Sequence, residues 1–291
     1  MTAPPADGPV LELIPARRAE LAPGVVVRRA LPRGGRRAVG PWCFLDHFGP
    51  LPADASMNLA PHPHIGLQTV TWLLEGELLH RDSLGSAQRI RPGQLNWMTA
   101  GRGIVHSEES PAEGTGPLHG VQLWVALPEA ERHRAPAFEH HEALPRLAEG
   151  ETVLTVLAGR VGGLVSPATA FSPLVAVDLA LPSGGRVRLP LDPAFEHAIV
   201  ALDGSADAAG HPFGLGELLY LGTCRHHLDL SADEPARLLL LGGAPLGEEL
   251  AMWWNFVARS PAEIEQAHAR WAAGDFGLVP GARLPPQPAP R

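Results

Sequence analysis

The chain has 291 residues, more than a single hydrophobic core usually needs, so two domains are expected. It contains 32 glycines and 31 prolines but only 19% charged residues, a balance that favours short strands and turns over long surface helices. The formal net charge of −8 and the lack of a run of basic residues weigh against direct binding of nucleic acid.

Short β-strands are predicted throughout the first half of the chain. The β-branched and aromatic residues at 69–74 predict a strand that ends at the turn around Gly76. Further strands are expected at residues 10–15, 24–31, 42–48, 78–81, 94–98, 104–106 and 118–127. Strands at intervals of about ten residues are typical of a β-sandwich or a β-barrel.

The second half of the chain repeats this pattern. The segment 128–150, which is charged and rich in Ala and Pro, is interpreted as a linker. Strands are then expected at residues 152–158, 174–181, 185–189, 198–202, 217–221 and 236–241. Because residues 198–204 resemble 70–76 and residues 215–220 resemble 92–97, we infer an internal duplication. The predicted domains are residues 1–135 and 136–291.

One helix is predicted near the end of the chain. Ser260 suits its N-cap, Pro261 its first turn and Glu263 the third position of a capping box. A stripe of residues with helical spacing follows, and Gly274 suits the C-terminal cap. We expect this helix to pack against the β-body.

Two short motifs carry the candidate metal ligands. His62-Pro63-His64 and His106-Ser107-Glu108 each place two ligand types at positions i and i+2. On a β-strand such residues point to the same face, so two neighbouring strands would direct three imidazoles and one carboxylate to a common point. This is the ligand set of a mononuclear metal site with positions left for water, oxygen or substrate. The alternative is a set of surface histidines beside turns.

The second half lacks these motifs. When Gly204 is aligned with Gly76, Pro190 and Asp192 fall opposite His62 and His64. Aligning Gly216 with Gly93 places Asp229 and Ser231 opposite His106 and Glu108. His226 and His227 are adjacent and would point to opposite faces of a strand. We therefore expect no second metal site.

The stretches around these motifs resemble the pirin family. They are HPHIGLQTVTWLLEGELLHRDSLG at 62–85, RPGQLNWMTAGRGIVHSE at 91–108, and GPWCFLDHFGP at 40–50. FVARSPAEIEQA at 256–267, with DFG at 275–277, is similar to the tail of bacterial pirins. The resemblance covers most of the chain. It implies an all-β fold of two cupin barrels packed face to face, with a short C-terminal helix and a metal in the N-terminal barrel only.

The resemblance also implies the ligands and the metal. The ligands would be His62, His64, His106 and Glu108, and the usual metal is iron (Fe2+/Fe3+), with other divalent transition metals as alternatives. Gln68 stands where many pirins have Glu, which would change a hydrogen bond that orients a ligand rather than remove the metal.

Several other residues near the motifs have two possible roles. Trp97 and Met98 would pack in the core or line the barrel mouth. Asp46 and His47 would support a ligand or be ordinary polar residues at a strand end.

Two functions follow from the resemblance. The first is a quercetin 2,3-dioxygenase, which opens a flavonol ring with O2 and releases carbon monoxide. Glu108 would then be the catalytic residue that accepts the substrate proton. The alternative is an iron- and redox-dependent regulatory protein that binds a metabolic enzyme or a transcription factor. A third reading is another cupin activity, such as an isomerase.

The remaining expectations concern partners and location. Cys43 and Cys224 lie far apart in sequence and form no metal or disulfide motif, which favours a reducing compartment. No apolar stretch reaches about 18 residues and no signal peptide is recognised, so a cytoplasmic protein without membrane contact is expected. The expected partner is a flavonol-like small molecule or another protein, and the expected state is a monomer.

Overall fold

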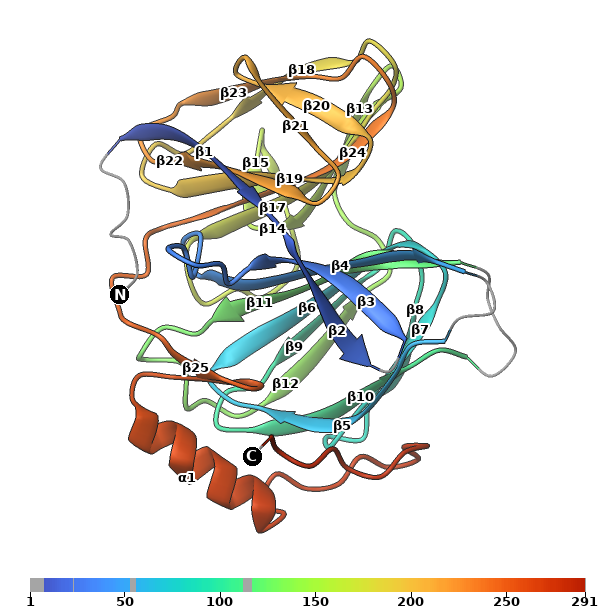
Figure 1. The fold of residues 1–291 in the computed structure, drawn as a ribbon, viewed down its shortest axis with the longest axis vertical. Helices are drawn as coiled ribbons and strands as arrows, with labels where there is room; N and C mark the ends of the chain where they lie inside the picture. Colours follow the sequence, from blue (N-terminus) through green and yellow to red (C-terminus); the bar gives the residue numbers. More distant parts are fainter. Residues whose placement is uncertain (1–7, 23, 53–55, 112–116, 291) are drawn as a thin grey trace. The chain divides into compact units, whose positions relative to one another are not determined.

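The computed structural model describes residues 8–22, 24–52, 56–111 and 117–290, which form β-strands and one helix (Figure 1). The strands of the first half are β1 (Pro9–Pro15), β2 (Arg17–Ala22), β3 (Val25–Leu31), β4 (Trp42–Leu51), β5 (Asn58–His64), β6 (Leu67–Glu75), β7 (Leu78–Asp82), β8 (Ala87–Ile90), β9 (Leu95–Thr99), β10 (Ile104–Glu109), β11 (Leu118–Ala126) and β12 (Ala137–His141). The remaining elements are β13 (Arg146–Glu149), β14 (Thr152–Ala158), β15 (Arg160–Val161), β16 (Leu164–Val165), β17 (Leu174–Leu181), β18 (Arg186–Pro190), β19 (Glu196–Asp203), β20 (Ser205–Ala208), β21 (His211–Gly214), β22 (Glu217–Gly222), β23 (His227–Ser231), β24 (Ala236–Gly243), β25 (Ala251–Trp253), β26 (Phe256–Ala258) and the helix α1 (Pro261–Ala272).

The first barrel, called here the N-terminal barrel, consists of a seven-stranded and a four-stranded sheet. The strand order is β12-β9-β6-β11-β4-β3-β2 in the larger sheet and β5-β10-β7-β8 in the smaller one. Neighbouring strands run antiparallel in the pairs β5–β10, β10–β7, β7–β8, β12–β9, β9–β6 and β6–β11, as in a cupin barrel.

The second barrel, called here the C-terminal barrel, has the same two sheets in the same order. Its larger sheet runs β1-β22-β19-β24-β17-β14-β13 and its smaller sheet runs β18-β23-β20-β21. An apolar core fills it, with Leu residues from several strands at its centre. The predicted duplication and the all-β fold of two cupin domains with one short C-terminal helix are therefore confirmed.

The compact units of the chain are discontinuous in sequence. The described residues of 1–19, 28–47 and 143–246 form one unit, and those of 20–27, 48–142 and 247–291 form the other. These ranges differ from the expected 1–135 and 136–291 at both ends of the chain. At the N-terminal end the reason is a backbone pairing, because β1 lies antiparallel to β22 at the edge of the C-terminal barrel.

The predicted linker contains two strands. β12 pairs with β9 in the N-terminal barrel, and β13 pairs with β14 in the C-terminal barrel. The linker interpretation of 128–150 was therefore wrong for these nine residues. Their charged and weakly alternating sequence is what an exposed edge strand tolerates, because only one of its sides is paired.

The predicted helix is confirmed as α1. The Ser260 side chain accepts a hydrogen bond from the backbone N–H of Glu263, and Gly274 follows the last turn with φ of 78°. Ala267 packs with Val105, Phe256 and Phe276 in a small apolar cluster. At 12 residues α1 is too short to cross a membrane, and the described part of the chain holds no helix that could.

Candidate metal centre

The two histidine-bearing strands, β5 and β10, lie side by side in the smaller sheet of the N-terminal barrel. Their antiparallel register places His106 opposite His62 and Ile104 opposite His64. All three histidine side chains are buried, with exposed fractions of 7% for His62 and 1% for His64 and His106. The prediction that the motifs meet on one face is confirmed for these three residues.

The three imidazole rings converge. Their centroids are 5.1 Å apart for His62 and His64, 4.4 Å for His62 and His106, and 5.0 Å for His64 and His106. One nitrogen from each ring lies within 4.8 Å of the others. Among the described residues, this is the one group of three or more His, Cys, Asp or Glu side chains with donor atoms so close together.

Hydrogen bonds fix which nitrogen faces the centre. Nδ1 of His62 donates to the carbonyl of Ala60 at 2.8 Å, and Nδ1 of His64 donates to the carbonyl of Asn255 at 3.0 Å. A neutral ring that carries its proton on Nδ1 has a bare lone pair on Nε2, and that nitrogen can bind a metal. Nε2 of His64 lies 3.1 Å from Nε2 of His106, so one cation between them would satisfy both nitrogens. The residues therefore fit a single transition-metal ion.

Burial keeps these rings neutral. Loss of solvent lowers the pKa of His62 to about 4 and lowers the pKa values of His64 and His106 well below the ordinary value. Neutral imidazole is the form that binds a metal, so the site is ready to accept one at neutral pH.

Glu108 lies beyond a β-bulge and has other neighbours. The pairing of β10 with β5 shifts between His106 and Glu108, so Glu108 falls opposite Leu59, while on its other side it falls opposite His80. Its carboxylate is 4% exposed and lies 3.1 Å from the Thr71 hydroxyl, and burial raises its pKa. It does not belong to the close group of donor atoms described above, so its role as the fourth ligand stays a prediction.

Two residues behind His106 were not singled out by the sequence reasoning. Nδ1 of His80 lies 3.4 Å from Nδ1 of His106, and Nε2 of His80 lies 3.1 Å from Oδ2 of Asp82. The same i, i+2 spacing that marked the two ligand motifs also occurs in His80-Arg81-Asp82 on β7, directly after the Gly76 turn. That spacing was the signal that could have found them.

The other residues considered near the motifs have structural roles. Gln68 donates to the Thr99 hydroxyl at 2.9 Å. Asp46 accepts two hydrogen bonds, of 2.7 and 2.6 Å, from the Arg29 guanidinium. Trp97 and Met98 are buried, as the core-packing reading predicted, and His47 is also buried.

The C-terminal tail supplies the carbonyl that orients His64. Asn255 follows Trp254, which has φ of 51°, in the turn between β25 and β26. β26 is held to the first histidine motif because Phe256 bridges to Ile65, and Val257 donates to the Ile65 carbonyl at 3.2 Å. A backbone group about 190 residues away in sequence thus completes the histidine site.

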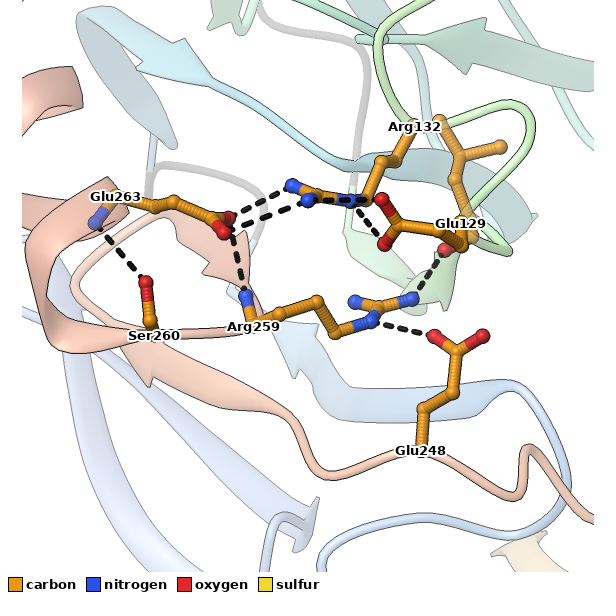
Figure 2. Close-up of polar contacts among 7 residues, drawn as sticks. Glu129, Arg132, Glu248, Arg259, Ser260 and Glu263 are labelled. Atoms are coloured by element: carbon orange, nitrogen blue, oxygen red, sulfur yellow. Dashed lines mark hydrogen bonds and ion pairs between the residues drawn. The ribbon is translucent and has the colours of Figure 1, made fainter.

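Ion pairs hold the tail in this position (Figure 2). Glu263 of α1 pairs with Arg132 at 2.7 Å, and Arg132 also pairs with Glu129. Arg259 donates to the Leu127 carbonyl at 2.7 Å and pairs with Glu248. Figure 2 shows the Arg132 guanidinium between the carboxylates of Glu129 and Glu263, and the Arg259 guanidinium beside the carboxylate of Glu248. The network joins the tail to the turn that follows β11.

The C-terminal barrel has apolar residues at the matching positions. Strand pairing matches Leu230 to Glu108, because Ala208 opposes Leu230 as His80 opposes Glu108. It then matches Leu228 to His106 and Leu189 to His62. The gap-free alignment had placed Pro190 and Asp229 at these two points and was wrong by one residue. Leucines therefore stand at the three matched positions of this barrel, and His226 and His227 are exposed.

Comparison with known proteins gives a consistent result. A family model described as pirin matches residues 24–125, and one described as the pirin C-terminal cupin domain matches residues 176–277. A Pseudomonas aeruginosa protein named "Putative quercetin 2,3-dioxygenase" is 49% identical over 289 residues, covering 97% of this chain and 91% of its own. A pirin-like protein of Caulobacter vibrioides is 40% identical, covering 90% of this chain and 93% of its own.

A solved structure is similar along nearly the whole chain. The crystal structure of quercetin 2,3-dioxygenase from Acinetobacter baumannii has a TM-score of 0.92 and 41% identity. The similarity covers 97% of this chain and 95% of that chain.

Proposed function

The chain belongs to the pirin family, and from this premise we propose that its N-terminal barrel holds one metal ion, with iron as the native metal. His62, His64 and His106 would be ligands through Nε2, and Glu108 would be the fourth ligand. The observation that carries the proposal is the convergence of three buried, neutral imidazoles whose outer nitrogens point at backbone carbonyls or at another side chain.

We propose that the activity is that of a quercetin-type flavonol 2,3-dioxygenase. The names of the similar proteins favour this enzyme over the regulatory alternative. A bound redox-active ion would supply a Lewis acid for the flavonol hydroxyl and a route for electrons to O2. The protein's own part is to orient the ligands, exclude water and accept the proton of that hydroxyl.

Glu108 is the candidate proton acceptor. Its carboxylate is buried, its pKa is raised by that burial, and a base with a raised pKa is better matched to a proton released near neutral pH. The Thr71 hydroxyl lies 3.1 Å from Glu108 and 2.9 Å from the amide oxygen of Gln122. Since one hydroxyl has one proton to donate, Thr71 can bond either group and thereby accompany a change in the protonation of Glu108.

The test is aerobic quercetin consumption by metal-loaded protein, followed by flavonol absorbance and O2 uptake. Glu108→Gln keeps the shape of the side chain but removes the base, and we expect it to abolish turnover. The matched control is Glu109→Gln, because Glu109 is also buried but pairs with Arg283 in the tail. Absence of turnover at full occupancy with iron, manganese, cobalt, nickel and copper would refute the proposed activity.

A further inference from the structure

A chain of polar contacts leads away from the third histidine into the smaller sheet. Nδ1 of His106 lies 3.4 Å from Nδ1 of His80, and Nε2 of His80 lies 3.1 Å from Oδ2 of Asp82. All three side chains are buried, with exposed fractions of at most 3%. Unlike His62 and His64, His106 has a side chain rather than a backbone carbonyl behind its ring.

The far end of this chain is anchored by backbone groups. The other carboxylate oxygen of Asp82, Oδ1, accepts hydrogen bonds from the N–H groups of Leu84 at 2.9 Å and Ser86 at 3.0 Å. Asp82 is therefore a fixed carboxylate whose Oδ2 accepts a hydrogen bond from Nε2–H of His80.

This anchor determines the proton positions along the chain. Because Asp82 only accepts, Nε2 of His80 carries a proton, and in the neutral form of the ring this leaves a lone pair on Nδ1. That lone pair can accept a hydrogen bond from Nδ1–H of His106. The lone pair of His106 is then on Nε2, the nitrogen 3.1 Å from Nε2 of His64.

We propose that His80 and Asp82 are positioning residues that hold the ligand His106 in its metal-binding tautomer. The inference rests on the proposed metal site and names how one ligand is prepared for it. It follows the general pattern in which a ligating histidine donates its second N–H to a fixed acceptor, here another imidazole backed by a carboxylate.

Two further observations support this role. The His80 ring stacks on Phe138 of β12, with centroids 4.3 Å apart and an interplanar angle of 10°, so its orientation is fixed by packing. In the C-terminal barrel, strand pairing matches His80 to Ala208 and His106 to Leu228. The barrel that has Leu228 in place of His106 therefore has Ala208 in place of His80.

The sharpest test is Asp82→Asn. Two backbone N–H groups hold the Oδ1 position, so the new amide nitrogen must replace Oδ2 and face His80. It would donate to Nε2 of His80, move the proton of His80 to Nδ1, and drive the proton of His106 to Nε2, where the metal binds. We expect metal affinity to fall about 10- to 100-fold, the usual effect of losing such a support.

A second pair of variants separates orientation from packing. His80→Leu removes the acceptor and should weaken metal binding by a similar factor, whereas His80→Gln offers an amide oxygen and should restore part of it. The control is His140→Leu, which removes a part-buried histidine that bonds Asn96 in the same barrel. Thermal unfolding of each metal-free variant shows whether it is folded.

The readouts are the Co2+ dissociation constant and the proton NMR spectrum of the Co2+-loaded protein. The wild type should show three strongly shifted exchangeable N–H protons, one for each histidine ligand, and Asp82→Asn should lose or displace one of them. Wild-type Co2+ affinity and an unchanged spectrum in folded Asp82→Asn and His80→Leu would overturn the proposed positioning role of His80 and Asp82. If the wild type binds Co2+ but does not turn over flavonols, only the proposed activity is refuted. If the wild type binds no Co2+, both the metal site and the positioning role of His80 and Asp82 are overturned.

Discussion

The two barrels share their strand order but differ in what they enclose. At positions matched by strand pairing, the N-terminal barrel has His62, His106 and Glu108, whereas the C-terminal barrel has Leu189, Leu228 and Leu230. The three leucines belong to a closed apolar core, and the two histidines and Glu108 are equally buried but polar. The alternation of inward and outward residues therefore specifies the barrel, while a few inward side chains decide whether its interior is an apolar core or a polar site.

A β-bulge marks the same difference in the backbone. The pairing of β10 with β5 shifts between His106 and Glu108, whereas the matching pair β23 and β18 runs without a shift. Bulges re-aim side chains, and this one separates Glu108 from the register that places His106 opposite His62.

The largest expected effect comes from giving the N-terminal barrel a residue of the other barrel. His106→Leu copies Leu228 and removes the central ligand, so we expect metal binding to fall below detection. The stability of the metal-free protein should rise by about 1 kcal/mol or more, because an apolar side chain replaces a buried polar one. Metal titration and chemical unfolding measure the two effects.

The control for this prediction is His226→Leu, which changes an exposed histidine of the C-terminal barrel and should alter neither property. Full metal affinity in His106→Leu would mean that the histidine group is not the metal site.

The reverse experiment makes a cavity in the C-terminal barrel. Leu228 is 1% exposed, so Leu228→Ala should lower the free energy of unfolding by about 2–5 kcal/mol. Metal affinity per folded molecule should stay at the wild-type value, because the change lies in the barrel without ligands. A loss of affinity in the folded variant would contradict the assignment of separate roles to the barrels.

Acid should destabilise the metal-free protein through its buried histidines. The pKa of His62 is about 4 when folded and near 6.5 when unfolded, so its contribution is complete above pH 6.5 and is lost as the pH falls toward 4. The lost stability should approach about 3 kcal/mol for this group. Glu108 acts in the opposite direction, because its raised pKa favours the folded, protonated form as the pH falls.

Urea unfolding between pH 7.5 and 4.5 measures this slope, and the comparison is with His62→Leu, in which it should be flatter. His197 of the C-terminal barrel also has a pKa lowered to about 4 by burial, but it is present in both proteins and cancels in the difference. Equal slopes would show that His62 is not held neutral.

The smallest expected effect concerns the C-terminal helix. Ser260→Ala removes the side chain that accepts from the N–H of Glu263, which should destabilise α1 by about 1 kcal/mol. Hydrogen exchange should quicken in α1 and leave the strands of the C-terminal barrel unchanged, because α1 belongs to the unit that contains the site. Faster exchange in both barrels would contradict this separation.

Much of the site could be predicted because it depends on strand periodicity. Side chains two residues apart on a strand point to the same face of the sheet. This rule alone predicted that His62, His64 and His106 would lie together. The cap residues of α1 were equally local signals. Membership in the pirin family followed from stretches of sequence around the same motifs.

The features of the fold and the site that could not be predicted depend on contacts that sequence spacing does not encode. The gap-free alignment chose Pro190 and Asp229 where pairing gives Leu189 and Leu228, and a slip of one residue exchanges the inner and outer faces. The acceptor behind His64 is a backbone carbonyl, which has no residue-type signal. The pairing of β1 with β22 joins segments about 200 residues apart.

The central claim is that one barrel binds one metal ion through three histidines while the other binds none. The most direct measurement is metal analysis of anaerobically purified protein combined with X-ray absorption at the edge of the metal found. We predict about one ion per chain with three imidazole nitrogens in its first coordination sphere. Two ions per chain, or a bound ion without imidazole ligands, would contradict the account.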